Sequence, residues 1–164
     1  MISVIFIING RLSNCLQAQE QILEVASDEI QISAILTRSS LDAIDLAEQA
    51  IINGTHYIIA VGGDGMVNEV VNGYMKASEE IRCKVALGIF SSGKGNDYVK
   101  SLGTSGELQE LFALIKGEQT KAVDVGLVTC VGLDGEESKR YFINITDVGL
   151  GGYIVQDIDL SGTF

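Results

Sequence analysis

Residues 62–65, Gly-Gly-Asp-Gly, have the composition that most clearly indicates chemistry in this chain. They separate an apolar run at 57–61 from a series of apolar residues with helical spacing. Glycines at a strand-to-helix turn leave room for a ligand to approach the backbone closely. The amides that open a helix carry a partial positive charge, which favours phosphate. The pattern therefore predicts a nucleotide phosphate site, with an ordinary tight turn as the alternative.

Three polar residues extend this motif. Asp64 lies inside the turn, where a carboxylate beside phosphate is unfavourable unless a metal ion, or a hydroxyl about to lose its proton, lies between them. Asn68 belongs to the helix that follows. Glu69 has a simpler interpretation, because acidic residues near a helix N-terminus compensate the helix dipole.

A second polar loop resembles a P-loop only superficially. Residues 88–95 read GIFSSGKG, but Gly95 stands where a Walker loop needs a serine or threonine to hold magnesium. A better interpretation is a polar turn that opens a helix, with Lys94 placing a cation on phosphate. Asp97 either caps that helix or takes part in the chemistry, and both readings stay open.

Apolar patterning indicates how these loops are positioned. It predicts strands at 3–8, 30–36, 57–61 and 84–90, separated by helices at 13–25, 40–52 and 64–77, with shorter helices at 97–102 and 105–116. Within the first helix we expect Leu16, Ile22, Leu23 and Ala26 to face inward, and we expect Ser40 to act as the N-cap of the second. Strict alternation predicts an α/β fold with a largely parallel sheet flanked by helices.

Ligands of parallel sheets bind beyond the carboxyl ends of the strands. Asn9, Thr37, the turn at 62–65 and the loop at 91–97 all occupy such ends, so we expect them to meet at one edge of the sheet. After Gly117 the pattern changes. Two extended runs at 122–131 and 140–148 predict an antiparallel hairpin. Asp124 at its entry is an acidic residue among apolar neighbours and needs a partner or a metal ion if it is buried.

Composition restricts the class of protein. The chain has 164 residues, 46% hydrophobic and 20% charged, which predicts a folded globular body. A net charge of −11 without a basic run argues against nucleic acid and against anionic membrane surfaces as partners. Cys15, Cys83 and Cys130 contain no CxxC pair and predict reduced thiols in the cytoplasm. The single histidine, His56, has no metal-ligand spacing, so we interpret it as structural.

Four blocks of this sequence resemble the diacylglycerol kinase catalytic-domain family, which includes bacterial lipid kinases, sphingosine kinases and, more distantly, NAD kinases. GGDGMVNEVVNG at 62–73 is similar to the family's GGDGTxNEVxNG block, and LGIFSSGKGNDYVKSLG at 87–103 to its LGxxPxGTxNDFARxLG block. VDVG at 123–126 and FINITDVGLGG at 142–152 match later strands in position and character. The resemblance covers essentially the whole chain.

This resemblance implies an ATP-dependent lipid kinase that transfers the γ-phosphate to a hydroxyl of diacylglycerol or a related lipid, with Mg²⁺ as cofactor. Carried over by position, the acidic residues that organise magnesium and water are Asp64, Asp97 and Asp124. The resemblance implies that the direct metal ligands lie in the missing C-terminal part, and none is assigned in this chain. The residues that contact or border the nucleotide are Asn9, Thr37, Gly62, Gly63, Asp64, Gly65, Met66, Asn68, Glu69 and Lys94.

Three departures from the family pattern bear on catalytic efficiency. Met66 replaces a threonine and so removes a hydroxyl that bonds phosphate. Lys94 also stands at a threonine position, where its charge can restore affinity. Ser91 and the Asn9-Gly10 turn replace prolines that stiffen these loops.

Family members are longer and carry a second, β-rich domain, so we expect this chain to be a fragment without kinase activity of its own. We assign 1–121 to the nucleotide-binding domain and 122–164 to the beginning of the lipid-binding and catalytic domain. Any peripheral membrane contact would then come through the missing part, and the identity of the lipid and a homodimer stay open. An NAD kinase-like enzyme and a non-enzymatic nucleotide sensor are the alternatives. The SSGKGND block favours the lipid kinases.

Overall fold

A computed structural model describes residues 1–91, 97–132 and 135–144, without the side chains of Ser91 and Asp97. The chain divides after Asp124 into two units, and each is described by itself. This division lies close to the expected domain boundary at 121. The role assigned to the second part stays a prediction.

Four strands form the sheet of the first unit: β1 (Ile2–Ile8), β2 (Ile30–Leu36), β3 (Tyr57–Gly62) and β4 (Ala86–Ser91). Their order is β2-β1-β3-β4, and all neighbouring pairs are parallel. Ile8 pairs with Leu36 on one side and with Val61 on the other, so the carboxyl ends of three strands are level. The expected parallel sheet is confirmed.

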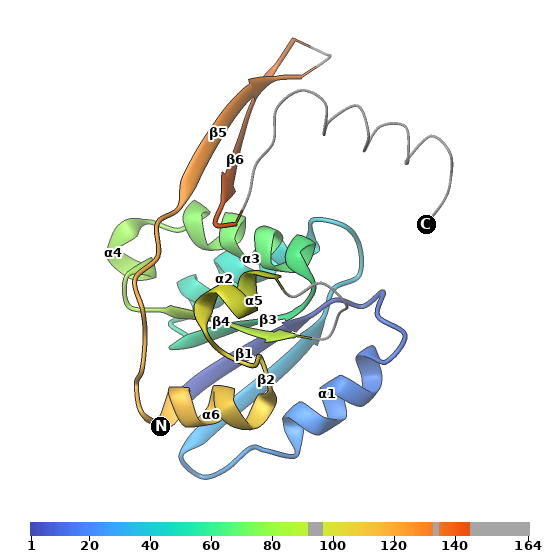
Figure 1. Cartoon of the computed structure of the whole chain (residues 1–164), viewed down its shortest axis with the longest axis vertical. Coiled ribbons are helices and arrows are strands. Elements are labelled where there is room, and N and C mark those ends of the chain that lie inside the picture. The colour runs from blue at the N-terminus through green and yellow to red at the C-terminus, as the bar shows by residue number, and fades with distance from the viewer. Residues whose placement is uncertain (92–96, 133–134, 145–164) are drawn as a thin grey trace. The chain divides into compact units, whose positions relative to one another are not determined.

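Helices cover both faces of this sheet: α1 (Cys15–Leu23), α2 (Asp42–Ile52), α3 (Asp64–Lys76) and α6 (Leu108–Lys116). The chain moves outward from β1 to β2 and then returns past β1 to β3. Because crossovers between parallel strands are right-handed, this reversal places α1 on one face and the next two helices on the other. Figure 1 shows α1 and α6 on one side of the sheet, and α2 and α3 on the opposite side. Two short helices, α4 (Glu79–Arg82) and α5 (Asp97–Leu102), flank β4.

The core follows the alternation of the strands. Val4, Phe6 and Ile8 of β1 form a buried cluster with Ile22 of α1 and with α6, where the rings of Phe6 and Phe112 lie 6.0 Å apart. On the other face α2 and α3 approach closely. A Cβ atom on Gly73 of α3 would lie 2.1 Å from the carbonyl oxygen of Ile44 and 2.8 Å from Cβ of Ala47. A glycine at this position is therefore required by packing.

The amino ends of β1 and β3 are joined by polar contacts. The Nδ1 atom of His56 accepts a hydrogen bond from the Ser3 amide at 3.1 Å and lies 2.7 Å from Ser3 Oγ. The His56 amide in turn donates to Ser3 Oγ at 3.1 Å. These bonds lie at the opposite end of the sheet from the glycine turn, and they support the structural role expected for His56.

Two local expectations for the first two helices are wrong. Of the residues expected to face inward, Ile22 is buried, whereas Leu16, Leu23 and Ala26 are exposed. The reason is that α1 packs mainly beside β2 at the sheet edge and buries only Ala18 and Ile22, four residues apart. Ser40 does not cap α2. Leu41 precedes this helix with a φ of 68°, and the Asp42 carboxylate accepts a hydrogen bond from the Arg38 amide at 2.8 Å.

In the second unit, β5 (Gly126–Val131) and β6 (Glu137–Phe142) form an antiparallel hairpin, as expected from the sequence. Gly126 lies opposite Phe142, and a Cβ atom on this glycine would come within 2.3 Å of the Phe142 ring. The absence of a side chain at Gly126 therefore allows the Phe142 ring to pack at the base of the hairpin. Residues 145–148 of the second expected strand lie outside the described residues.

Candidate functional site

A cleft of about 200 Å³ opens where β1 and β2 end and α3 begins. In the order β2-β1-β3-β4, the strand that follows β1 in the chain lies on one side of it and β3 lies on the other. Open α/β sheets bind ligands in the crevice at such a topological switch point. Polar side chains and glycine backbone make up most of the cleft. Its lining residues are Asn9, Gly10, Arg11, Thr37, Arg38, Ser39, Ser40, Gly65, Met66 and Glu69.

Hydrogen bonds join the loops that follow β1 and β2. The Thr37 hydroxyl accepts from the Gly10 amide at 3.1 Å, and Asn9 Oδ1 accepts from the Arg11 amide at 3.0 Å. A Cβ atom on Gly10 would lie 2.2 Å from the Thr37 carbonyl oxygen, so only glycine permits this approach. Because a hydroxyl that accepts one bond can still donate its own proton, Thr37 keeps a donor for a ligand.

Two of the three glycines in the turn after β3 face open space. Gly62 is explained by packing, since its φ is 155° and an added Cβ would lie 3.0 Å from Met66 Cβ and 3.3 Å from Asn9 Cβ. Around Gly63 and Gly65, by contrast, an added Cβ would meet no atom within 4 Å. Neither residue has a positive φ. Neither backbone conformation nor packing within the described residues requires these two glycines, and the free space suits the close approach of a ligand.

The same turn forms the N-terminus of α3. Gly63 is the N-cap residue, and no side chain caps this end of the helix. The Gly63 carbonyl accepts from the amides of Met66 at 3.0 Å and Val67 at 3.2 Å. The amides that precede Met66, those of Asp64 and Gly65, have no partner within the helix, and they give this end a partial positive charge. An anion held here would meet backbone donors directly.

Acidic and amide side chains of α3 follow the turn. Asp64 and Glu69 are both half-buried, and Glu69 lines the cleft. Asn72 is buried, and its Nδ2 atom donates to the Asn68 carbonyl oxygen at 2.8 Å and to Asn68 Oδ1 at 3.3 Å. Asn72 thereby fixes the Asn68 side chain one helical turn below the glycines.

The structure brings most of the expected nucleotide-binding residues together. Asn9, Thr37, Gly65, Met66 and Glu69 line one cleft. The residues Gly62, Gly63 and Asp64 belong to the adjoining turn, and Asn68 lies on the next part of α3. Met66 is buried beneath the turn and packs toward Gly62, so it contributes shape where the family pattern has a hydroxyl.

Of the three remaining expected residues, the structure describes the side chain of Asp124 alone. Lys94 and the side chain of Asp97 lie outside the described residues. Asp124 is exposed, so the burial that would have demanded a partner is not found. Across residues 1–91, 97–132 and 135–144, no three histidine, cysteine or acidic side chains gather closely enough to hold a metal ion, and no magnesium ligand is assigned.

Sequence reasoning missed two arginines in the cleft, Arg11 and Arg38. The signal was available, because Arg38 directly follows Thr37 and Arg11 lies two residues after Asn9, both polar residues at strand ends. Arg38 is engaged with Asp42, which lies 3.4 Å from Nε and 3.3 Å from Nη2. Hydrogen bonds from the Arg38 side chain, and then from its backbone, lower the pKa of Asp42. This pair fixes the loop that leads from β2 into α2.

The family model for the diacylglycerol kinase catalytic domain matches residues 3–128, which include the sheet, its helices and the whole cleft. The chain belongs to the diacylglycerol kinase catalytic domain family. The match confirms the family that the glycine motif indicated and does not favour an NAD kinase.

Individual members of this family give the same result. A protein of Chromohalobacter salexigens, named "Probable lipid kinase YegS-like", is 32% identical over 148 residues, covering 90% of this chain and 44% of the relative. A protein of Staphylococcus haemolyticus, named "Diacylglycerol kinase", is 35% identical over 126 residues, covering 77% of this chain and 33% of the relative. The chain thus spans less than half the length of these two relatives.

A solved structure shares the fold. The crystal structure of a diacylglycerol kinase from Bacillus anthracis superposes with a TM-score of 0.65 at 27% identity, covering 95% of this chain and 54% of the other. Among the described residues, no helix is long and apolar enough to cross a membrane.

Proposed function

We propose that this chain supplies the nucleotide-binding part of an ATP-dependent lipid kinase, which transfers the γ-phosphate to a hydroxyl of diacylglycerol or a related lipid. The observation that carries the proposal is the open space around Gly63 and Gly65 at the uncapped start of α3. Membership of the diacylglycerol kinase catalytic domain family supports the reaction class.

Different parts of the cleft would contact the phosphates of ATP in different ways. Bound ATP would supply the phosphoryl group. The first-turn amides of α3 offer donors to its phosphates, the two open glycines let the phosphates come close, and the Thr37 hydroxyl adds a side-chain donor from β2. Phosphoryl transfer depends chiefly on positioning and on neutralising charge, so a rigid cradle of this kind is a suitable site.

Asp64 has the position for a chemical role. It is half-buried in the first turn of α3, beside the glycines that would receive phosphate. A carboxylate there either helps to hold a cation or accepts the proton of the attacking hydroxyl. We include magnesium in the proposal because ATP-dependent transfer uses a divalent cation to neutralise phosphate charge.

The remaining parts of the proposal concern partners and compartment. We propose ATP and a lipid as the substrates, and no nucleic acid, because the net charge is −11. The three cysteines are free thiols, which fits a reducing compartment such as the cytoplasm. The lipid-binding, catalytic and membrane-contacting roles expected of the second part remain part of this proposal.

Calorimetric titration with ATP and magnesium tests nucleotide binding directly. The 164-residue chain should give saturable heat, and complete indifference of a folded sample would contradict the proposal. The chemical step requires a protein extended to the length of its relatives. There Asp64→Asn should lower kcat by at least about a hundredfold, the usual scale of a lost general acid–base group, while ATP affinity changes only a few-fold. A change in affinity without any lipid phosphorylation by the parent protein would instead indicate a nucleotide sensor.

A further inference from the structure

The cleft has an imbalance of charge that an ATP site must resolve. Asp64 and Glu69 lie half-buried at and beside the phosphate-binding turn, and both repel a polyphosphate. Helix amides contribute only partial charges. The magnesium of the proposed function would offset part of the phosphate charge, and a cationic side chain would offset more of it. Within the described residues, the cations that line the cleft are Arg11 and Arg38.

These two arginines differ in the interactions that their guanidinium groups already make. Arg38 lies against Asp42, with its Nε and Nη2 atoms 3.4 and 3.3 Å from the carboxylate oxygens. That carboxylate offsets the charge of Arg38 and holds its guanidinium toward α2. The side chain of Arg11 is exposed and forms neither a hydrogen bond nor an ion pair with the described residues.

The backbone of Arg11 is nevertheless held in place. Its amide donates to Asn9 Oδ1 at 3.0 Å, and the neighbouring Gly10 amide donates to the Thr37 hydroxyl at 3.1 Å. The next amide, of Leu12, donates to the Asn9 carbonyl oxygen at 3.1 Å. Three hydrogen bonds thus fix the base of a side chain whose charged end is free, an arrangement suited to a ligand rather than to a structural ion pair.

We infer that Arg11 is a phosphate-binding residue of this cleft, supplying the cationic side chain that the first turn of α3 lacks, whereas Arg38 serves to fix the loop after β2. The inference rests on the proposed function and adds a residue to it. A guanidinium suits this task because its planar set of donors can bond two phosphate oxygens at once. It also supplies a side-chain donor in a cleft where Met66 has none to offer.

The test compares single-charge variants of the same chain by titration with ATP and magnesium. Arg11→Ala should weaken ATP binding about tenfold, the scale expected for one charge-assisted hydrogen bond. Its affinity should also depend less steeply on sodium chloride, because one ionic contact with phosphate is gone. Arg11→Lys should recover part of the lost affinity, and Arg38→Ala should cost less than Arg11→Ala.

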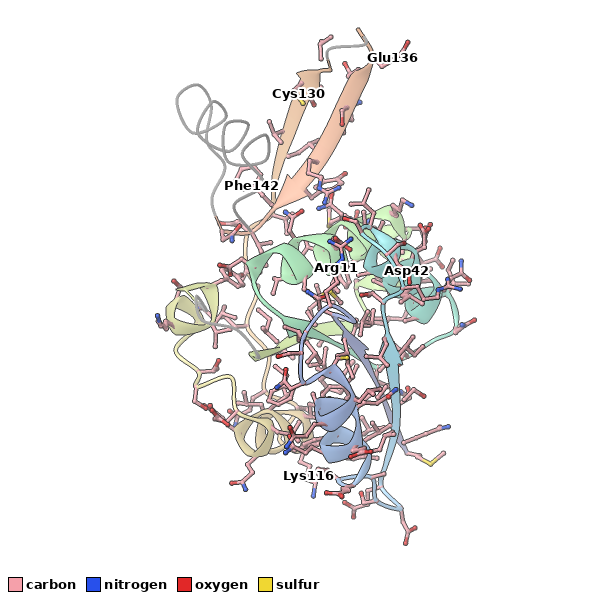
Figure 2. All side chains as sticks on the ribbon, turned by 90° about the vertical axis from the view of Figure 1, so that its right-hand side faces the viewer. Arg11, Asp42, Lys116, Cys130, Glu136 and Phe142 are labelled. Atoms are coloured by element: carbon pink, nitrogen blue, oxygen red, sulfur yellow. The ribbon has the colours of Figure 1, made fainter. Side chains whose placement is uncertain are left out.

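Lys116→Ala is the matched control, because it removes the same charge from an exposed position. Figure 2 shows Lys116 at one end of the first unit, with Arg11 and Asp42 at the other. This variant should bind ATP like the parent chain. A cooperative thermal transition in every variant establishes that each is folded.

Two results would overturn the inference while leaving the proposed function intact: full ATP affinity in Arg11→Ala, or a loss whose salt dependence matches that of the parent. Absence of ATP binding by the parent chain would overturn both. The two failures are therefore distinguishable in one series of titrations.

Discussion

The two ends of α3 use glycine for opposite reasons. At the first turn Gly65 is exposed, and an added Cβ would meet nothing within 4 Å. Two turns later Gly73 is buried against α2, where an added Cβ would lie 2.1 Å from a backbone oxygen. Packing against α2 therefore requires a glycine near the end of α3, whereas no neighbouring atom requires one at its start.

A second contrast separates the beginnings of α2 and α3. The Asp42 carboxylate at the start of α2 accepts bonds from the backbone and side chain of Arg38. Neither α2 nor α3 has a side-chain cap at its start. The difference between the two starts is therefore the pair with Arg38, which engages the first acidic residue of α2.

The largest effect is expected at Gly73. Gly73→Ala should gain about 1 kcal/mol of helix propensity but lose up to about 3 kcal/mol to overpacking, a net loss of about 2 kcal/mol in the free energy of unfolding. Urea denaturation measures this loss. An unchanged midpoint would show that α2 and α3 can separate at little cost, contrary to their close packing.

Gly65→Ala makes the same chemical change in the same helix and should act in the opposite direction. We expect ATP binding to weaken by about tenfold as the methyl group enters the ligand's space, while the free energy of unfolding stays level or rises by up to about 1 kcal/mol. Calorimetry and urea denaturation give the two values. If the free energy of unfolding fell as it does in Gly73→Ala, packing would also require a glycine at position 65.

The smallest effect is expected at the start of α2, where Asp42 is engaged with Arg38. Hydrogen bonds from Arg38 lower the pKa of Asp42 from its usual 3.8, so this carboxylate stabilises the folded state above that value. Asp42→Asn should therefore lower the thermal midpoint slightly at neutral pH, because the Arg38 side chain is exposed and the interaction is screened by solvent. The difference should fade as the pH falls through the lowered pKa. A difference that persists below it would point to the hydrogen bond from the Arg38 amide instead.

The fold and the place of the site followed from the sequence because both depend on the order of elements. Alternating apolar segments fixed the parallel sheet, and the carboxyl ends of its strands brought Asn9, Thr37 and the glycine turn to one edge. Exposure along α1 did not follow, since Leu16 and Leu23 have the right spacing but lie at a sheet edge without a partner surface among the described residues. Likewise, the sequence alone does not distinguish Gly65 from Gly73, because the difference between them is that α2 packs against Gly73 and not against Gly65.

The cleft draws its lining from three crossovers: residues 9–11 after β1, 37–40 after β2, and 65–69 at the start of α3. These segments meet only once β2 has docked on one side of β1 and β3 on the other. The cleft therefore depends on contacts between segments that lie far apart in the chain, and no single βαβ unit encodes it. A ligand that contacts all three segments would link the ends of neighbouring strands. Its binding free energy would therefore add to the free energy of unfolding of the whole sheet.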